Sequence, residues 1–269
     1  MTEQQTPDRS NETRLYLVVR DDIGHGRAGL ARLAAQATWS GMAMARMVAP
    51  ERHAAYDQSV QPKIAVRVKS EDQLLRVMDE CQQAGLPVTS VGAGNGMPGG
   101  LCIGPVTRAE LPPFLAKQRL LADDERPDLE ASSPVPAPGE DDLALILLAR
   151  ADAGIPWGKL AAQAGHAALS SVTRSSIFSD RPRPDGWEQS GMPVIYAEVP
   201  DLAAFDAAYR SCRRVPCARI VDAGRTVFGG APTPTVVGIG PALVRELPPE
   251  VRQWLPDAVP APTPGPGPR

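Results

Sequence analysis

The chain has 269 residues, of which 43% are hydrophobic, 22% are charged and 4% are aromatic, and its formal net charge is −3. This length accommodates two modest domains with a core each, and the composition excludes a disordered or fibrous chain. The acidic balance also excludes attraction to nucleic acid over the whole surface, so an RNA partner requires a local basic patch.

The first half of the chain alternates short apolar strands with helical segments. A polar arm covers residues 1–13, and the next domain is expected over residues 14–110. Period-2 and period-3.6 patterns predict a strand, helix, strand, helix, strand and strand at residues 15–19, 29–47, 63–69, 70–85, 87–91 and 101–103. Pro50 lies just beyond the first helix and is interpreted as its stop.

Residues 111–142 differ in character, because they are rich in proline and acids and poor in aromatic side chains. Such a segment buries too little apolar area to offset its ordering entropy, so it is predicted to be a linker with a short helix near residues 117–121. The proline-rich residues 256–269 are expected to form a disordered or extended tail.

The order of elements then repeats over residues 143–255. The second set is predicted at residues 143–148, 159–172, 194–199, 201–214, 218–221 and 236–239. Matched landmarks lie about 130 residues apart, a spacing that indicates two domains and not a solenoid of short repeats. The landmark pairs are Leu33-Ala34-Ala35-Gln36 with Leu160-Ala161-Ala162-Gln163, Pro62 with Pro193, Ala93-Gly94 with Ala223-Gly224 and Gly104-Pro105 with Gly240-Pro241.

The segment 220–241 carries the most chemistry. An apolar run ends at Asp222, a turn follows, and a second β-rich run begins near Thr235. Two strands are therefore expected to present an acid, an arginine (Arg225) and hydroxyls, including that of Thr226, at adjacent ends, where functional residues are common. The alternative is an ordinary hairpin in which Asp222 and Thr226 satisfy turn amides.

A second candidate is the helix that opens the second copy. Lys159, Gln163 and His166 stand at i, i+4 and i+7, so they point from one face of that helix. A solvated polar stripe is the alternative for the lysine and the glutamine. For His166, a hydrogen-bonded structural histidine is an equally good interpretation.

Taken in order, the motifs of the second copy resemble the type 2 peptidyl-tRNA hydrolases. The matching segments are GKLAAQAGHAAL at 158–169, Trp187, GMPV at 191–194, DAGRT at 222–226 and TPTVVGIGP at 233–241. The resemblance implies an α/β domain with a four-stranded mixed β-sheet flanked by α-helices. It also implies hydrolysis of the ester that joins a peptide to the 3′ end of tRNA, a reaction of translation that uses no metal and no organic cofactor.

The resemblance assigns roles to particular residues. Lys159 matches the family's essential lysine, and Gln163 and His166 match polar positions of its helix. Asp222, Thr226 and Thr235 match the acid and the two threonines. Ester hydrolysis requires a positioned water, a proton acceptor and a cation or donor for the oxyanion. Asp222 is expected to orient or deprotonate the water, and Lys159 to stabilise the oxyanion or to hold the terminal phosphate or ribose.

Substrate contacts are expected from a local cluster of basic residues around the DAGRT turn. The candidates are Gly224, Arg225, Arg174 and Arg214. A solubilising face is the alternative for these arginines. The sequence departs from the family at Ile155-Pro156-Trp157-Gly158 and at Met192-Pro193-Val194, and both departures remove positive charge where tRNA is expected to lie.

The first copy departs further. Arg32 replaces the helix lysine, Trp39 replaces the histidine and Gly92 is aligned with the acid, so this copy is interpreted as degenerate and non-catalytic. Because family members are generally homodimers, the two copies are expected to form an intramolecular pseudo-dimer in which Lys63 supplies a tRNA contact. The alternative for the whole chain is a non-catalytic tRNA-binding or protein-binding module.

The predictions about cofactors and cellular compartment rest on features that the sequence lacks. The four cysteines form no CxxC pair and no His/Cys ligand cluster, so no metal is expected. The polar start lacks an apolar leader, and no run of about 18 apolar residues occurs. A cytoplasmic protein that does not enter a membrane is therefore expected.

Overall fold

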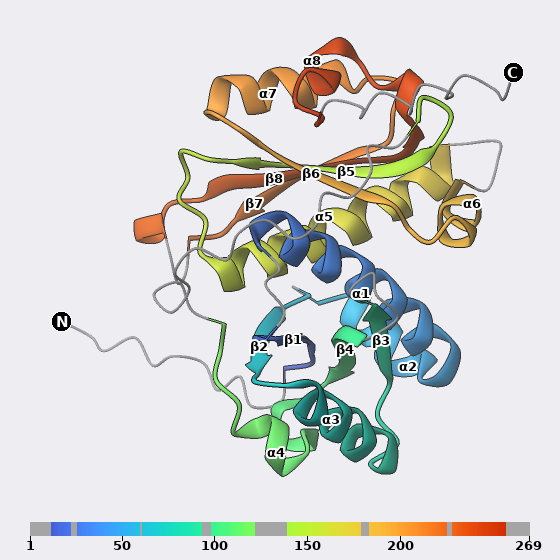
Figure 1. Ribbon diagram of the computed structural model, residues 1–269, viewed down its shortest axis with the longest axis vertical. Coiled ribbons are helices and arrows are strands. Elements are labelled where there is room, and N and C mark those ends of the chain that lie inside the picture. The colour runs from blue at the N-terminus through green and yellow to red at the C-terminus, as the bar shows by residue number, and fades with distance from the viewer. Residues whose placement is uncertain are drawn as a thin grey trace, which may run out of the picture. The chain divides into compact units, whose positions relative to one another are not determined.

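The computed structural model describes residues 12–22, 26–59, 61–92, 98–121, 139–178, 183–224 and 228–256 (Figure 1). The strands are β1 (Arg14–Arg20), β2 (Lys63–Val68), β3 (Val88–Gly92), β4 (Pro98–Val106), β5 (Leu143–Arg150), β6 (Val194–Val199), β7 (Cys217–Asp222) and β8 (Thr233–Leu243). The α-helices are α1 (Gly26–Val48), α2 (Pro50–Asp57), α3 (Glu71–Gln83), α4 (Pro113–Ala116), α5 (Trp157–Phe178), α6 (Arg183–Gln189), α7 (Leu202–Ser211) and α8 (Pro249–Arg252).

The strands form two four-stranded sheets with one topology. Their orders are β2-β1-β4-β3 and β6-β5-β8-β7. In each sheet the first two strands of the repeat are parallel, and the other neighbours are antiparallel. The predicted fold class, two repeated α/β domains with mixed sheets, is therefore confirmed.

Each sheet buries one face under the helix that follows its second strand. In the first repeat, Leu74, Val77 and Cys81 of α3 pack on Val18 and Leu101 of the sheet. Ser70 caps α3, because its hydroxyl accepts a hydrogen bond from the backbone N–H of Gln73 at 3.4 Å. The cap thus fixes the first turn of α3, and the apolar side chains of the helix pack on the sheet.

The second repeat is built in the same way. Phe205 and Ala208 of α7 pack with Ile146, Leu148 and Val237 of the sheet, and Figure 1 shows α7 and α8 on one side of this sheet. The apolar run at the start of this repeat is buried on both faces, as the sequence predicted for a continuous apolar strand.

One local prediction is wrong, and some helices were not predicted. The helix α1 ends at Val48, before Pro50 as expected, and Pro50 then begins α2, because proline is well suited to the first helical position. The short helix expected at 117–121 is wrong: α4 lies earlier, and residues 119–121 are extended along β2, with the Leu121 N–H donating to the Ala65 carbonyl at 3.0 Å. The sequence analysis also missed α2, α6 and α8.

By contact density the chain divides into two compact units that do not coincide with the two sequence repeats. The first unit comprises residues 1–132 and 154–169, and the second comprises residues 133–153 and 170–269. The boundary crosses α5, so the first half of this helix belongs to the unit that contains the first repeat.

The contact between α1 and α5 joins equivalent positions of the repeats. Thr38 and Gly165 match when the landmark segments are aligned, and a Cβ atom at Gly165 would clash with Thr38 Oγ1. The Thr38 hydroxyl is fully buried and has no hydrogen-bond partner among the residues that the structure describes. Glycine in mid-helix costs about 0.5–1 kcal/mol relative to alanine, so its presence here reflects the need for close packing.

Gly165→Ala should therefore destabilise the protein by about 1–3 kcal/mol through overpacking, despite its better helix propensity. Thr38→Ala removes both the clashing oxygen and an unsatisfied buried hydroxyl, so the double variant should recover most of the loss. Urea unfolding of the four proteins of this cycle measures the coupling. Gly186→Ala is the control, because its Cβ would meet only the flexible end of Leu143 at 3.1 Å. Additive effects would contradict the prediction.

Candidate active site

The carboxylate of Asp222 is fixed at the end of β7. Asp222 is 5% exposed, and its Oδ1 accepts a hydrogen bond from the backbone N–H of Gly224 at 2.8 Å. Gly224 has a φ of 74°, and a Cβ there would lie 2.5 Å from the carbonyl oxygen of Ala231. Only glycine fits this turn, so the sequence Asp222-Ala223-Gly224 holds the acid in one orientation.

Thr235 lies on the neighbouring strand, two residues beyond the residue opposite that acid. In the antiparallel pairing of β7 and β8, Asp222 is opposite Thr233, and the register shifts between Ile220 and Val221. Thr235 is fully buried, and its hydroxyl donates to the carbonyl oxygen of Ile220 at 3.3 Å. The structure thus brings Asp222, Gly224 and Thr235 together at one end of the second sheet, where the sequence expected adjacent strand ends.

An arginine that the sequence analysis did not select holds this end of the sheet together. Arg150, the last residue of β5, makes a bidentate ion pair with Asp152, with Nε–Oδ1 and Nη2–Oδ2 distances of 2.9 and 2.6 Å. Its Nη1 donates to the carbonyl oxygen of Pro234 at 3.2 Å. The hydrogen bond from Arg150 lowers the pKa of Asp152, so the pair is ionised at neutral pH. Because Pro234 directly precedes Thr235, Arg150 ties the start of β8 to β5.

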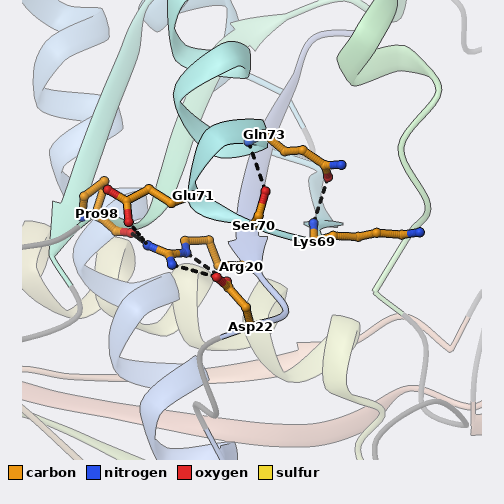
Figure 2. Close-up of polar contacts among 7 residues, drawn as sticks. All are labelled: Arg20, Asp22, Lys69, Ser70, Glu71, Gln73 and Pro98. Atoms are coloured by element: carbon orange, nitrogen blue, oxygen red, sulfur yellow. Dashed lines mark hydrogen bonds and ion pairs between the residues drawn. The ribbon is translucent and has the colours of Figure 1, made fainter.

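The first repeat contains the same arginine clamp. Figure 2 shows Arg20 paired with Asp22, at 2.9 and 2.8 Å, and bound to the carbonyl oxygen of Pro98 at 3.1 Å. Arg20 also contacts Glu71 of α3 at 3.0 Å. The recurrence of the Arg-x-Asp sequence at the same place in both repeats is a signal from which the pairing of Arg150 with Asp152 could have been predicted.

The three polar residues of α5 lie in the first unit. Gln163 is 5% exposed, whereas Lys159 and His166 are partly buried. His166 Nδ1 lies 3.0 Å from Lys63 Nζ. Burial, and then the charges of Lys63 and Lys159, lower the pKa of His166 well below its usual value. His166 is therefore a neutral imidazole at physiological pH.

Lys63 is not placed like a surface contact for phosphate. It is 7% exposed and packs inside the first unit, where its Nζ lies 5.7 Å from the centre of the Tyr56 ring. Burial lowers the pKa of Lys63 to about 7, and a smaller effect from Cys102 opposes this shift. This environment favours a structural contact with His166 over the tRNA contact expected from the sequence.

The other residues expected to bind substrate fall into two groups. Arg174 and Arg214 are exposed in the second unit, and Arg174 Nη1 donates to the carbonyl oxygen of Cys217 at 2.6 Å. Arg225 and Thr226 lie outside the residues that the structure describes, so their expected roles stay predictions.

Strand pairing corrects the alignment of the two repeats by one residue at the acid. Gly92 is opposite Pro98 in the first sheet, as Val221 is opposite Pro234 in the second, so Gly92 corresponds to Val221 and not to Asp222. The next residue, Ala93, lies outside the described residues and is not an acid. By the same registers Gly99 takes the place of Thr235, so the first repeat lacks this hydroxyl as well.

Neither a metal centre nor a membrane span is evident in the part of the chain that the structure describes. Within it, no three His, Cys, Asp or Glu side chains are grouped so as to hold a metal ion. None of its helices is both long and apolar enough to cross a bilayer. Within the second unit, the polar groups of the candidate site are those of β7 and β8.

Comparison with known proteins places these observations in a family. The model of the family described as "Peptidyl-tRNA hydrolase PTH2" matches residues 13–121 and again residues 143–252. Peptidyl-tRNA hydrolase 2 of Saccharomyces cerevisiae is 38% identical over 121 residues, which cover 42% of this chain and 57% of the yeast protein. The peptidyl-tRNA hydrolase of Sulfurisphaera tokodaii is 33% identical over 105 residues, or 37% of this chain and 86% of the archaeal one.

A mouse protein extends the comparison. Mitochondrial peptidyl-tRNA hydrolase 2 of Mus musculus is 31% identical over 148 residues, covering 54% of this chain and 79% of the mouse protein. The two separate matches to one family model confirm the tandem duplication that the landmark pairs indicated.

Proposed function

This chain belongs to the peptidyl-tRNA hydrolase PTH2 family, and on that basis we propose that it hydrolyses the ester between a peptide and the 3′ end of tRNA, releasing free tRNA. The observation that carries the proposal is the arrangement of Asp222 and Thr235 at the paired ends of β7 and β8. The first repeat lacks both groups. We therefore propose that the second repeat carries the activity.

The chemistry that we propose is direct attack of water on the ester carbonyl. Asp222, oriented by the Gly224 N–H, accepts a proton as the water oxygen bonds to the carbonyl carbon. The ammonium of Lys159 stabilises the negative charge that develops on the carbonyl oxygen. The tetrahedral intermediate then breaks the bond to the ribose oxygen, which leaves with a proton as the tRNA 3′ hydroxyl. Thr226 and Thr235 supply further polar groups around the water. Gln163 and His166 supply polar groups on the face of α5 that carries Lys159.

For the substrate, we propose that tRNA phosphates contact a local set of arginines. Arg174 and Arg214 are exposed in the second unit, and Arg225 belongs to the DAGRT turn. Phosphate contacts of this kind give an affinity for tRNA that falls as the salt concentration rises. Because the overall charge of the chain is negative, these contacts have to come from a local set of basic residues. We propose the cytoplasm as the site of action, although one relative carries the description mitochondrial.

We further propose that the two repeats form an internal pseudo-dimer. The packing of Thr38 against its equivalent Gly165 supports this, because residues close to a twofold axis meet their own equivalents.

Release of labelled peptide from peptidyl-tRNA by the purified full chain tests the proposed activity. The expected result is catalytic turnover in the presence of a metal chelator, with free tRNA and free peptide as products. Binding of tRNA without any release would instead support the alternative of a non-catalytic module. Neither binding nor release would reject the proposal.

The arginine clamp gives a prediction with an internal control. Arg150→Lys keeps the charge but loses the bidentate pair and the contact with Pro234, so the start of β8 is less well held. We expect kcat to fall roughly 10-fold, as for other residues that orient a functional group. Arg20→Lys removes the same contacts in the first repeat and should leave kcat unchanged. Equal effects of the two substitutions on kcat would refute a local role for Arg150.

A further inference from the structure

The first half of α5 approaches the first repeat closely along one side. A Cβ atom at Gly158 would clash with the carbonyl oxygen of Leu121, and one at Gly165 would clash with Thr38. These two glycines are seven residues apart and so lie on the same side of the helix. Within the first unit, α5 therefore rests on the first repeat at two places where only glycine fits.

Arg27 of α1 anchors the segment that leads into α5. Its Nη1 donates to the carbonyl oxygen of Ile155 at 2.9 Å, and its guanidinium lies 5.8 Å from the centre of the Trp157 ring. A hydrogen bond and a cation–π contact thus come from one side chain of the first repeat. They fix the start of the helix that carries Lys159.

The polar contact at the far end of this surface is between Lys63 and His166. Lys63 Nζ lies 3.0 Å from His166 Nδ1 and 3.4 Å from the carbonyl oxygen of Gln61. A lysine ammonium has only donors, so when Lys63 is protonated the Nδ1 atom must accept. The proton of the neutral imidazole is then on Nε2, and the Lys63 contact selects both the tautomer and the orientation of the ring.

The charged and titratable groups around this pair come from several elements. Lys159 lies on the same helix as His166, Tyr56 contributes its ring from α2, and Cys102 lies on β4. Burial raises the pKa of the Cys102 thiol to about 12, so this group is neutral near pH 7. Lys159 and the protonated form of Lys63 both favour the uncharged form of His166. Because the pKa of Lys63 is about 7, its charge acts fully on His166 only below that pH.

We propose that Lys63 of the non-catalytic first repeat is a positioning residue for the second repeat, which it serves by fixing the ring of His166 on the face of α5 that carries Lys159 and Gln163. This inference rests on the proposed hydrolase function for its kinetic consequence. It gives the degenerate repeat a specific task, which is to supply in the same chain a contact that orders the helix of its sister. Lys63 acts through His166 and does not itself touch the substrate.

The test compares the full chain with Lys63→Met, which keeps the length of the side chain and removes its donor. We expect kcat for peptide release to fall roughly 10-fold with little change in KM, as for other partners that orient a functional histidine. In a His166→Ala background, Lys63→Met should have no additional effect. Lys117→Met is the matched control, because Lys117 is an exposed lysine of the same unit.

A readout that does not depend on activity separates this inference from the proposed function. The chain has three histidines, and ¹⁵N NMR of the imidazole nitrogens, assigned with His166→Ala, reports which nitrogen is protonated. The spectra are recorded about one pH unit below the Lys63 pKa of about 7, where Lys63 is protonated and His166 is still neutral. In the wild type Nδ1 of His166 should then be unprotonated, whereas in Lys63→Met both tautomers should be populated.

The possible outcomes distinguish a failure of the proposed function from a failure of the positioning role of Lys63. A wild-type chain that releases no peptide rejects the proposed function, and the NMR comparison then decides the positioning role alone. Identical imidazole spectra in the wild type and Lys63→Met overturn the inference. So does an unchanged kcat in an active protein, or a loss in Lys63→Met that is equally large in the His166→Ala background.

Discussion

Asp222→Asn should lower kcat for release of peptide from peptidyl-tRNA by about 10²- to 10⁴-fold, the usual contribution of a positioned general base. Asparagine has almost the same shape as aspartate, and its carbonyl oxygen can still accept the hydrogen bond that the Gly224 N–H donates to Oδ1 at 2.8 Å. The turn should therefore persist, while the group that we propose takes the proton from water is lost. Single-turnover kinetics with saturating enzyme measure this loss without interference from product release.

A matched substitution separates chemistry from folding. Asp201 caps α7 by accepting a hydrogen bond from the Ala204 N–H at 2.9 Å, and asparagine caps helices about as well as aspartate. Asp201→Asn should therefore leave both kcat and the unfolding midpoint close to the wild-type values. If Asp222→Asn retained more than a tenth of the wild-type kcat, Asp222 would not be the base, and its burial would reflect the turn alone.

Lys159→Met should lower kcat by about 10²- to 10³-fold if the ammonium stabilises the oxyanion, as for the loss of one donor of that kind. Methionine keeps the length and the apolar stem of the side chain, so the helix should keep its packing. A group that interacts only with the developing charge affects kcat and kcat/KM equally, whereas a group that holds the terminal phosphate or ribose mainly raises KM. Steady-state kinetics thus distinguish the two roles that the sequence left open.

Two further variants complete this experiment. Lys117→Met provides the exposed control within the same unit, and its kinetics should match those of the wild type. Lys159→Met combined with Asp222→Asn should lose less than the product of the two single effects, because residues that act on one reaction as a unit are not additive. Full additivity would indicate that the two groups serve different steps.

Much of the fold could be predicted from the sequence, because the patterns that indicate strands, helices and turns lie in short segments and recur in both repeats. The alternation of apolar residues at 63–69 and the continuous apolar run at 143–148 each predicted a strand, and both strands were confirmed. The landmark pairs predicted a duplication, which two sheets of one topology confirm. The mixed arrangement of the strands was only implied by the family resemblance, since strand order depends on contacts between distant segments.

The prediction of the candidate site was less complete. Asp222 and Thr235 were selected because a strand end with an acid and a turn is visible in a short segment, and the structure places both residues at that end of the sheet. Arg150 was missed as a clamp, although its neighbour Asp152 is two residues away, because its second partner is the carbonyl oxygen of Pro234. A backbone acceptor 84 residues distant leaves no trace in the sequence around Arg150.

The sequence by itself determined the α/β class, the tandem plan and the degenerate character of the first copy, because periodicity, turn residues and missing side chains are all properties of short segments. Only the tertiary structure shows where His166 and Lys63 lie. The sequence allowed a catalytic or a structural histidine and assigned Lys63 a contact with tRNA, whereas the fold buries Lys63 and places its Nζ 3.0 Å from His166 Nδ1. The two residues are 103 positions apart, and their pairing and lowered pKa values arise from burial that only the packed chain creates.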